Sequence, residues 1–175
     1  MAELFTQNLG RLLLWGLVAT TAMTTILQGS QGLGLSRLNM PFLAGTLFTA
    51  NRSHAVVIGF IAYTIGGWLF AMLYFAFFAS IGRASWWLGL LLGCLHGIVL
   101  LIAVLPLLPH AHPHMASEYD GPRSTHVLEP PGFLGLNYGY ATPLTTLLAQ
   151  AVYGATLGGL CQLGGLFAGN SQGLS

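Results

Sequence analysis

Three histidines at alternating positions are the residues of this chain best suited to chemistry. In the stretch PLLPHAHPHMASEYDGP, His110, His112 and His114 would point the same way if the chain were extended. Glu118 follows them, and His54 begins the second apolar segment on the same side of the membrane in the predicted topology. Imidazole and carboxylate groups suit zinc or copper(II), so these five residues form a candidate copper or zinc site.

The alternative is a polar loop that binds no metal. The stretch lacks a fixed ligand spacing such as H-E-x-x-H, and short histidine-rich tracts also arise from composition alone. Pro109 and Pro113 are expected to break any helix there. Enzymatic use of a metal would further need an open coordination position and a base, which Glu118 or Glu129 would supply. We expect no enzyme.

The composition places most of this chain in lipid. Hydrophobic residues make up 54% of the 175 residues, and charged residues make up only 5%, against about a quarter in soluble domains. Five arginines, four carboxylates and no lysine cannot cover the surface of a soluble protein of this size. A net charge of +1 without clustered basic residues also argues against nucleic acid as a partner.

Four apolar runs are long enough to cross a bilayer as helices, which takes about 20 residues. They cover roughly residues 10–31, 54–79, 85–108 and 143–167. Backbone groups in lipid must bond within the chain, and no apolar-polar alternation indicates a barrel. We therefore predict an all-α integral membrane protein, with residues 1–175 forming a single four-helix bundle. The first run lacks a convincing cleavage site, so we expect a retained helix and not a signal peptide.

Two connections should lie on one side of the membrane, namely residues 32–53 and 109–142. Asn39 and Pro41 predict the cap and first turn of a short interfacial or re-entrant helix in the first connection. Its apolar side would consist of Phe42, Leu43, Leu47 and Phe48. The second connection should be mostly irregular. Its last part, EPPGFLGLNYGYATPL, is interpreted as an interfacial anchor, and the alternative is a lid or a surface for a partner protein.

Small residues at four-residue spacing predict where the helices pack, because close backbone approach drives helix association in lipid. They are Gly89, Gly93 and Gly97 in the third span and Gly154 and Gly158 in the fourth. We expect them to lie at contacts inside one bundle, and the alternative is a homo-oligomer interface.

His96 is predicted to lie near mid-membrane, where an ionisable group suggests a function. Its candidate partners are Gln150, Tyr153, Thr24 and Gln28. We favour a neutral imidazole that fixes helix register. A proton relay or bis-histidine haem ligation would each require a second suitable group at the same depth.

Five motifs, in order, resemble those of a group of small four-span bacterial inner-membrane proteins without an established activity. The motifs are GLVATTAMT, NMPFLAGTLF, GGWLFAMLYFAFF, WWLGLLLGCLHGIVLLIAVLPLL and LLAQAVYGATLGGL. The resemblance covers most of the chain and implies a fold and a bacterial inner-membrane location only.

From the residues themselves we predict a non-catalytic accessory or structural subunit that packs against itself or a larger membrane complex. The sequence holds no nucleophile-base constellation and no phosphate-binding loop. The first alternative is metal binding by the histidine-rich loop. The second is a carrier or channel for a small or apolar solute, lined by Thr20, Thr24, Gln28, His96 and Gln150.

Overall fold

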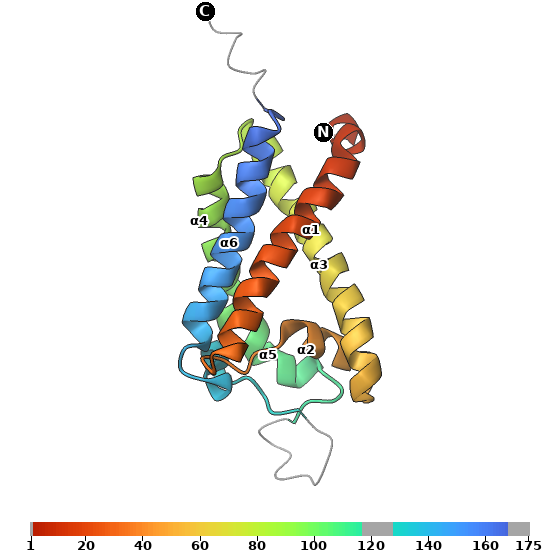
Figure 1. The fold of residues 1–175 in the computed structure, drawn as a ribbon, viewed down its shortest axis with the longest axis vertical. Coiled ribbons are helices and arrows are strands. Elements are labelled where there is room, and N and C mark those ends of the chain that lie inside the picture. Colours follow the sequence, from red (N-terminus) through yellow and green to blue (C-terminus); the bar gives the residue numbers. More distant parts are fainter. Residues whose placement is uncertain (1, 117–127, 168–175) are drawn as a thin grey trace, which may run out of the picture. The chain divides into compact units, whose positions relative to one another are not determined.

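Helices make up the computed structural model, which describes residues 2–116 and 128–167 (Figure 1). In chain order they are α1 (Ala2–Gly32), α2 (Met40–Thr46), α3 (Arg52–Ile81), α4 (Trp86–Val99), the π-helix η1 (Leu100–Val104), α5 (Leu105–Ala111), the 3-10 helix η2 (Phe133–Tyr138) and α6 (Thr142–Leu163). The residues described contain no strand, and Met115 and Leu128 form an isolated bridge. The predicted all-α class is confirmed.

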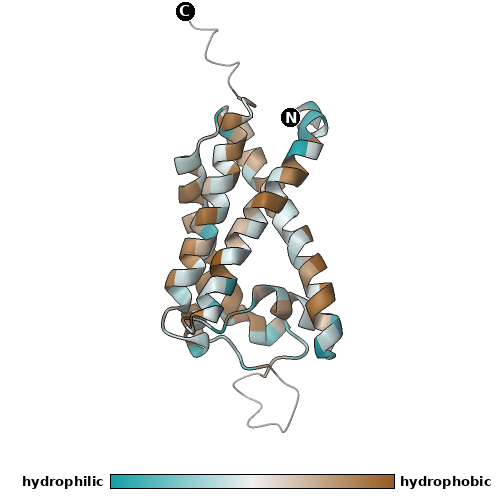
Figure 2. Ribbon diagram, viewed as in Figure 1, coloured by the Kyte–Doolittle hydropathy of each residue, from teal (hydrophilic) through white to brown (hydrophobic). Residues whose placement is uncertain are grey.

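Four helical segments are long and apolar enough to cross a membrane, so the chain is a multi-pass membrane protein. They are Phe5–Gly32, Arg52–Ile81, Trp86–Ala111 and Thr142–Leu163. Hydrophobic residues run along these helices, and hydrophilic ones gather toward their ends (Figure 2). The predicted spans are confirmed with shifted ends. For example, α1 begins at Ala2, where the Glu3 carboxylate in the first turn complements the helix dipole.

The third span contains two prolines, and one of them, Pro109, was expected to interrupt the helix. Pro106 lies in the first turn of α5, directly after the π-helix η1, and Pro109 lies inside α5. A proline lacks an N–H and crowds the carbonyl four residues earlier, and the wider π turn accommodates this loss before Pro106. The expectation that Pro109 breaks the helix is therefore wrong, and α5 continues to Ala111.

The chain divides into two compact units, each with its own buried residues. The first unit comprises Met1–Thr25, Thr64–His96 and Leu148–Ser175, and the second comprises Ile26–Tyr63 and Gly97–Leu147. The first unit contains segments of all four long helices. Its largest buried side chains include Phe75, Phe78 and Tyr153.

Helices α4 and α6 approach each other closely in the first unit because glycines line their contact. A Cβ on Gly89 would overlap the carbonyl of Gly154, and a Cβ on Gly93 would overlap that of Gln150. A Cβ on Gly158 would likewise overlap the Ser85 carbonyl. Only glycine allows such backbone contact, which supplies the van der Waals packing that holds helices together in lipid.

The short helix α2 packs just as closely against the start of α3 in the second unit. A Cβ on Gly45 would overlap the Ala55 carbonyl, and one on Gly59 would overlap the Pro41 carbonyl. The predicted cap is confirmed, since Asn39 Oδ1 accepts a hydrogen bond of 3.0 Å from the Phe42 N–H.

The predicted apolar side of α2 is partly wrong. Leu43 is buried as expected, but the helix ends at Thr46, so Leu47 and Phe48 follow it and are exposed. The buried face instead consists of Leu43, Gly45 and Thr46, because small residues allow close contact with α3. The core of this unit contains Leu38, Leu43, Leu101, Leu105, Met115 and Tyr138.

Candidate functional site

The three alternating histidines do not share one extended strand. His110 lies in the last turn of α5 and is exposed, His112 is the C-cap residue, and His114 lies in the turn that follows. The expected common direction is therefore wrong, because the helix continues past Pro109. His54 is exposed in the first turn of α3, where its N–H donates to Asn51 Oδ1 at 3.2 Å.

His112 is buried, with 4% of its surface exposed, and both ring nitrogens are engaged. Nε2 lies 3.2 Å from the Leu43 carbonyl oxygen and 3.2 Å from Thr46 Oγ1. Nδ1 accepts a 3.2 Å hydrogen bond from the His114 N–H. A carbonyl can only accept, so these partners assign the proton to Nε2.

His114 completes the arrangement, because its Nδ1 lies 2.7 Å from the carbonyl oxygen of Thr46. Leu43 and Thr46 belong to the last turn of α2, whose carbonyls lack the intrahelical partners of an interior turn. The two imidazoles hydrogen-bond these carbonyls from a segment far away in sequence. We call His112 and His114 the histidine cap.

Burial favours a neutral His112. Burial lowers the pKa of His112, the hydrogen bond to the Leu43 carbonyl raises it, and the neighbouring His114 lowers it. A metal ion would have to displace these hydrogen bonds. Within residues 2–116 and 128–167, no three His, Cys, Asp or Glu side chains are grouped to hold a metal ion. Glu118 lies outside the described residues, so a copper or zinc site that includes it stays a prediction.

His96 has a partner that the sequence analysis did not name. Its Nδ1 lies 3.3 Å from the Tyr74 hydroxyl, and its ring stacks on Phe70 with centroids 4.1 Å apart. Tyr74 in turn makes an edge contact with Tyr153, whose hydroxyl donates a 2.7 Å hydrogen bond to the Gly67 carbonyl. Phe70 and Tyr74 are four residues apart on α3 and so share one helix face. This spacing is the sequence feature that could have predicted an aromatic surface beside His96.

The other predicted intramembrane polar residues differ in their surroundings. Gln28 is exposed, whereas Gln150 is buried on α6. Among the described residues, Gln150 Oε1 and Thr20 Oγ1 have no hydrogen-bond partner. Gly97, the last glycine of the predicted third-span stripe, is buried.

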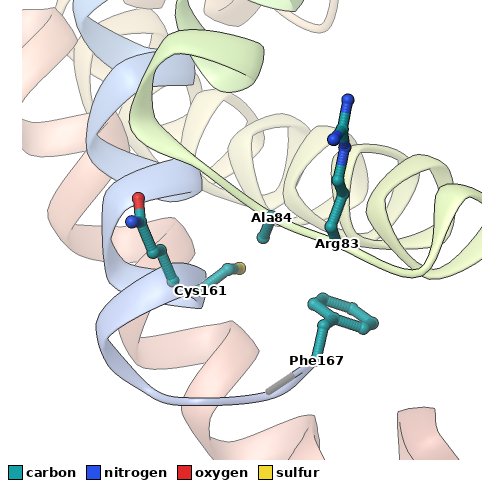
Figure 3. Close-up of a pocket in the computed structure, with 5 residues that line it drawn as sticks. Arg83, Ala84, Cys161 and Phe167 are labelled. Carbon is teal, nitrogen blue, oxygen red and sulfur yellow. The ribbon is translucent and has the colours of Figure 1, made fainter. Parts of the chain in front are cut away.

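A small cavity of about 150 Å³ lies in the first unit beside the turn between α3 and α4. All three of Arg83, Cys161 and Phe167 line this cavity, and Figure 3 shows that the Arg83 side chain points away from Cys161 and Phe167. The described lining offers one thiol and one guanidinium, without a carboxylate or an imidazole. It therefore provides no base to activate the thiol.

Of the four candidate spans in the described residues, α3 has the smallest buried share. Only 17% of the most hydropathic window of α3 is buried, compared with 50% for α6. We define the outer face of α3 as Ile65, Gly66, Leu69 and Leu73. Its three branched side chains are exposed, and a Cβ built on Gly66 would meet no atom within 4 Å.

Comparison of the chain with models of known protein families, with curated proteins and with solved structures gives no match.

Proposed function

We propose that this protein is a non-catalytic membrane subunit that associates with another membrane-spanning helix through the outer face of α3. The observation that carries this proposal is the position of Gly66. It lies midway along α3 with open space before it, between exposed Ile65 and Leu69. The partner helix belongs either to a larger membrane complex or to a second copy of this chain.

Glycine has a physical cost in this position. In a helix interior it is less favourable than alanine by about 1 kcal/mol, and it buries no side chain in lipid. The neighbouring Gly67 offsets that cost, because the Thr20 side chain fills the space where its Cβ would lie. Gly66 has no such neighbour among the described residues. A second helix that approaches closely at Gly66 would supply the missing contact.

The histidine cap supports a structural role for the polar residues nearby. His112 and His114 bond to the end of α2, so their imidazoles hold the fold of the second unit together. The resemblance to four-span bacterial proteins supports placing this subunit in a bacterial inner membrane, as part of the same proposal.

Substitution of Gly66 tests the proposal, with Gly10 as the matched control. A Cβ on either glycine would meet no atom within 4 Å, so neither Gly66→Leu nor Gly10→Leu should disturb the packing of the chain itself. Gly10 lies beside Arg11 near the polar end of α1. Each variant is extracted from its native membrane with a mild detergent, and the co-purifying proteins are identified by mass spectrometry.

We expect wild type and Gly10→Leu to migrate as the same larger assembly, and Gly66→Leu to migrate as an isolated chain. The mass of the assembly distinguishes a second copy from a different subunit. Unchanged assembly of Gly66→Leu would show that the outer face of α3 contacts only lipid, and would overturn the proposal.

A further inference from the structure

A cavity of about 210 Å³ in the second unit is lined by an ion pair and by apolar side chains. Its charged residues are Arg37 and Glu129, whose Nη2 and Oε2 atoms are 3.0 Å apart. The other lining residues used here are Phe42, Leu43, Leu128 and Tyr138. The volume is below the roughly 300–1,000 Å³ of sites for drug-sized ligands, so it suits a small polar group.

Hydrogen bonds hold the walls of this cavity in place. The Arg37 N–H donates to the Tyr138 carbonyl at 2.7 Å, and the Tyr138 hydroxyl donates to the Glu129 carbonyl at 2.6 Å. Burial raises the pKa of Tyr138 to about 12, so this hydroxyl remains a donor at neutral pH. Arg37 Nη2 also donates to the Asn137 carbonyl at 2.5 Å. The two charged groups are therefore oriented before any ligand binds.

The ion pair keeps hydrogen-bonding capacity for a ligand. A guanidinium carries five N–H donors, and the contacts described for Arg37 use Nη2 only, which leaves Nη1 and Nε. The same contact uses Oε2 of Glu129 and leaves Oε1. Both side chains are substantially exposed, at 67% for Arg37 and 49% for Glu129. The rim thus offers donors for an anion beside an acceptor for a cation.

The position of the cavity along the chain selects the ligand. Arg37 lies five residues after the first span ends at Gly32, and Glu129 lies in the connection that leads to the fourth span at Thr142. Two spans separate these connections, so both are on the same side of the membrane. Arg37 is close enough to a span end to lie at the depth of the lipid headgroups, and its ion pair holds Glu129 at the same depth.

We propose that this cavity binds the phosphoethanolamine headgroup of a membrane phospholipid. The phosphate accepts hydrogen bonds from Nη1 and Nε of Arg37, and the ammonium donates to Oε1 of Glu129. Phe42 and Leu128 contact the carbon atoms that lead to the acyl chains. Guanidinium groups bind phosphate well because their donors are planar and often bidentate. The proposal is independent of the helix-association function above.

The same geometry disfavours other common headgroups. A phosphoglycerol headgroup has no ammonium, so its phosphate would compete with Glu129 for Arg37 while Oε1 of Glu129 gains no cationic partner. A phosphocholine headgroup keeps the charge, but its methyl groups leave no N–H to donate to Oε1. The neutral Arg37–Glu129 pair therefore matches a zwitterion that has donors on its cationic end.

Lipid binding by the intact, delipidated protein tests the proposal. Native mass spectrometry in detergent measures binding of phosphatidylethanolamine, phosphatidylglycerol and phosphatidylcholine with identical acyl chains. Soluble phosphoethanolamine is titrated in parallel. The variants are Arg37→Gln and Glu129→Gln, and the matched controls are Arg83→Gln and Glu3→Gln, which lie outside the second unit. Thermal unfolding of each variant establishes that it is folded.

We expect wild type to prefer phosphatidylethanolamine about tenfold over the other two lipids, and both controls to behave alike. Arg37→Gln should weaken this binding about tenfold. Glu129→Gln should still bind lipid but should lose the preference for phosphatidylethanolamine over phosphatidylglycerol. This result tests the proposed headgroup site even if Arg37→Gln does not fold. Equal binding of all lipids by wild type would overturn the proposal. Binding of soluble phosphoethanolamine as tight as that of the lipid would also overturn it, in favour of a soluble phosphate ester.

Discussion

Replacement of His112 by alanine should destabilise the second unit, whereas replacement of the nearby His110 should not. His112 is buried and bonds to Leu43, Thr46 and His114, whereas His110 is exposed on α5. The two histidines are two residues apart, so the pair separates the histidine cap from a general effect of the histidine-rich stretch.

The size of the effect follows from the contacts that are lost. Hydrogen bonds contribute about 1 kcal/mol each to stability, and the bonds to the Leu43 carbonyl and from the His114 N–H therefore account for about 2 kcal/mol. The cavity left by a buried ring adds about 1 kcal/mol or more. We expect a loss of about 3 kcal/mol in the free energy of unfolding for His112→Ala. An exposed substitution such as His110→Ala should stay within about 0.5 kcal/mol.

Two measurements check this expectation in detergent. Circular dichroism on heating should show a midpoint lowered by about 6–12 °C for His112→Ala, at about 2–4 °C per kcal/mol for a chain of this size. Hydrogen exchange of the peptide that covers Met40–Thr46 should become faster in the same variant, because α2 loses its cap.

An unchanged midpoint and unchanged exchange in His112→Ala would refute the structural role of the histidine cap. Equal destabilisation by His110→Ala would refute it as well. If both variants instead lose a stoichiometric copper or zinc ion, the metal site predicted from the sequence would replace the histidine cap as the explanation.

Three further predictions concern pH, the α4–α6 contact and the partner of His96. Because burial lowers the pKa of His112 in the folded protein, the unfolded chain binds more protons between that pKa and the ordinary value of about 6.5. Stability should therefore be complete above about pH 6.5 and decrease as the pH falls below it, and His112→Gln should flatten this dependence in unfolding titrations at several pH values. Gly154→Ala should cost about 1–3 kcal/mol, because its Cβ would overlap the Gly89 carbonyl. Gly159→Ala should be nearly neutral in the same unfolding assay, because its Cβ would lie 3.7 Å from Trp86 Cβ, an ordinary contact. Equal costs for the two alanine variants would contradict the close α4–α6 approach. Tyr74→Phe removes the hydroxyl that lies 3.3 Å from His96 Nδ1, and it should cost about 1 kcal/mol. If Tyr74→Phe leaves the free energy of unfolding unchanged and a substitution of Gln150 lowers it, the partner of His96 would be Gln150, as predicted from the sequence.

Local and compositional signals made much of the fold predictable. Four apolar runs without carboxylates specify membrane helices, and Asn39 followed by Pro41 specifies the start of α2 through the geometry of a helix cap. The end of the third span was predicted wrongly, because Pro109 was expected to end the helix. A proline removes only one N–H and crowds only the nearby carbonyls. Neighbouring turns can accommodate Pro109, so its identity alone does not fix the end of α5.

The contacts of the candidate sites were less predictable, because they join residues far apart in sequence. His112 bonds to Leu43 across 69 positions, and Arg37 pairs with Glu129 through a second long-range contact. No periodicity within one helix encodes either contact. His96 was assigned partners on the first and fourth spans, whereas the structure places Tyr74 of α3 beside it. Which neighbouring helix presents a hydroxyl depends on the rotation of each helix, and a hydropathy pattern with little asymmetry leaves that rotation undetermined.

Photocrosslinking from the outer face of α3 tests the central claim most directly. A photoreactive benzoylphenylalanine replaces Leu73 on this face or, as a control, the equally exposed Leu14 on α1. Intact cells are irradiated, and the adducts are identified by mass spectrometry. A subunit that associates through α3 predicts one discrete protein adduct from position 73 and none of that mass from position 14. Lipid adducts alone at both positions would contradict the proposed function.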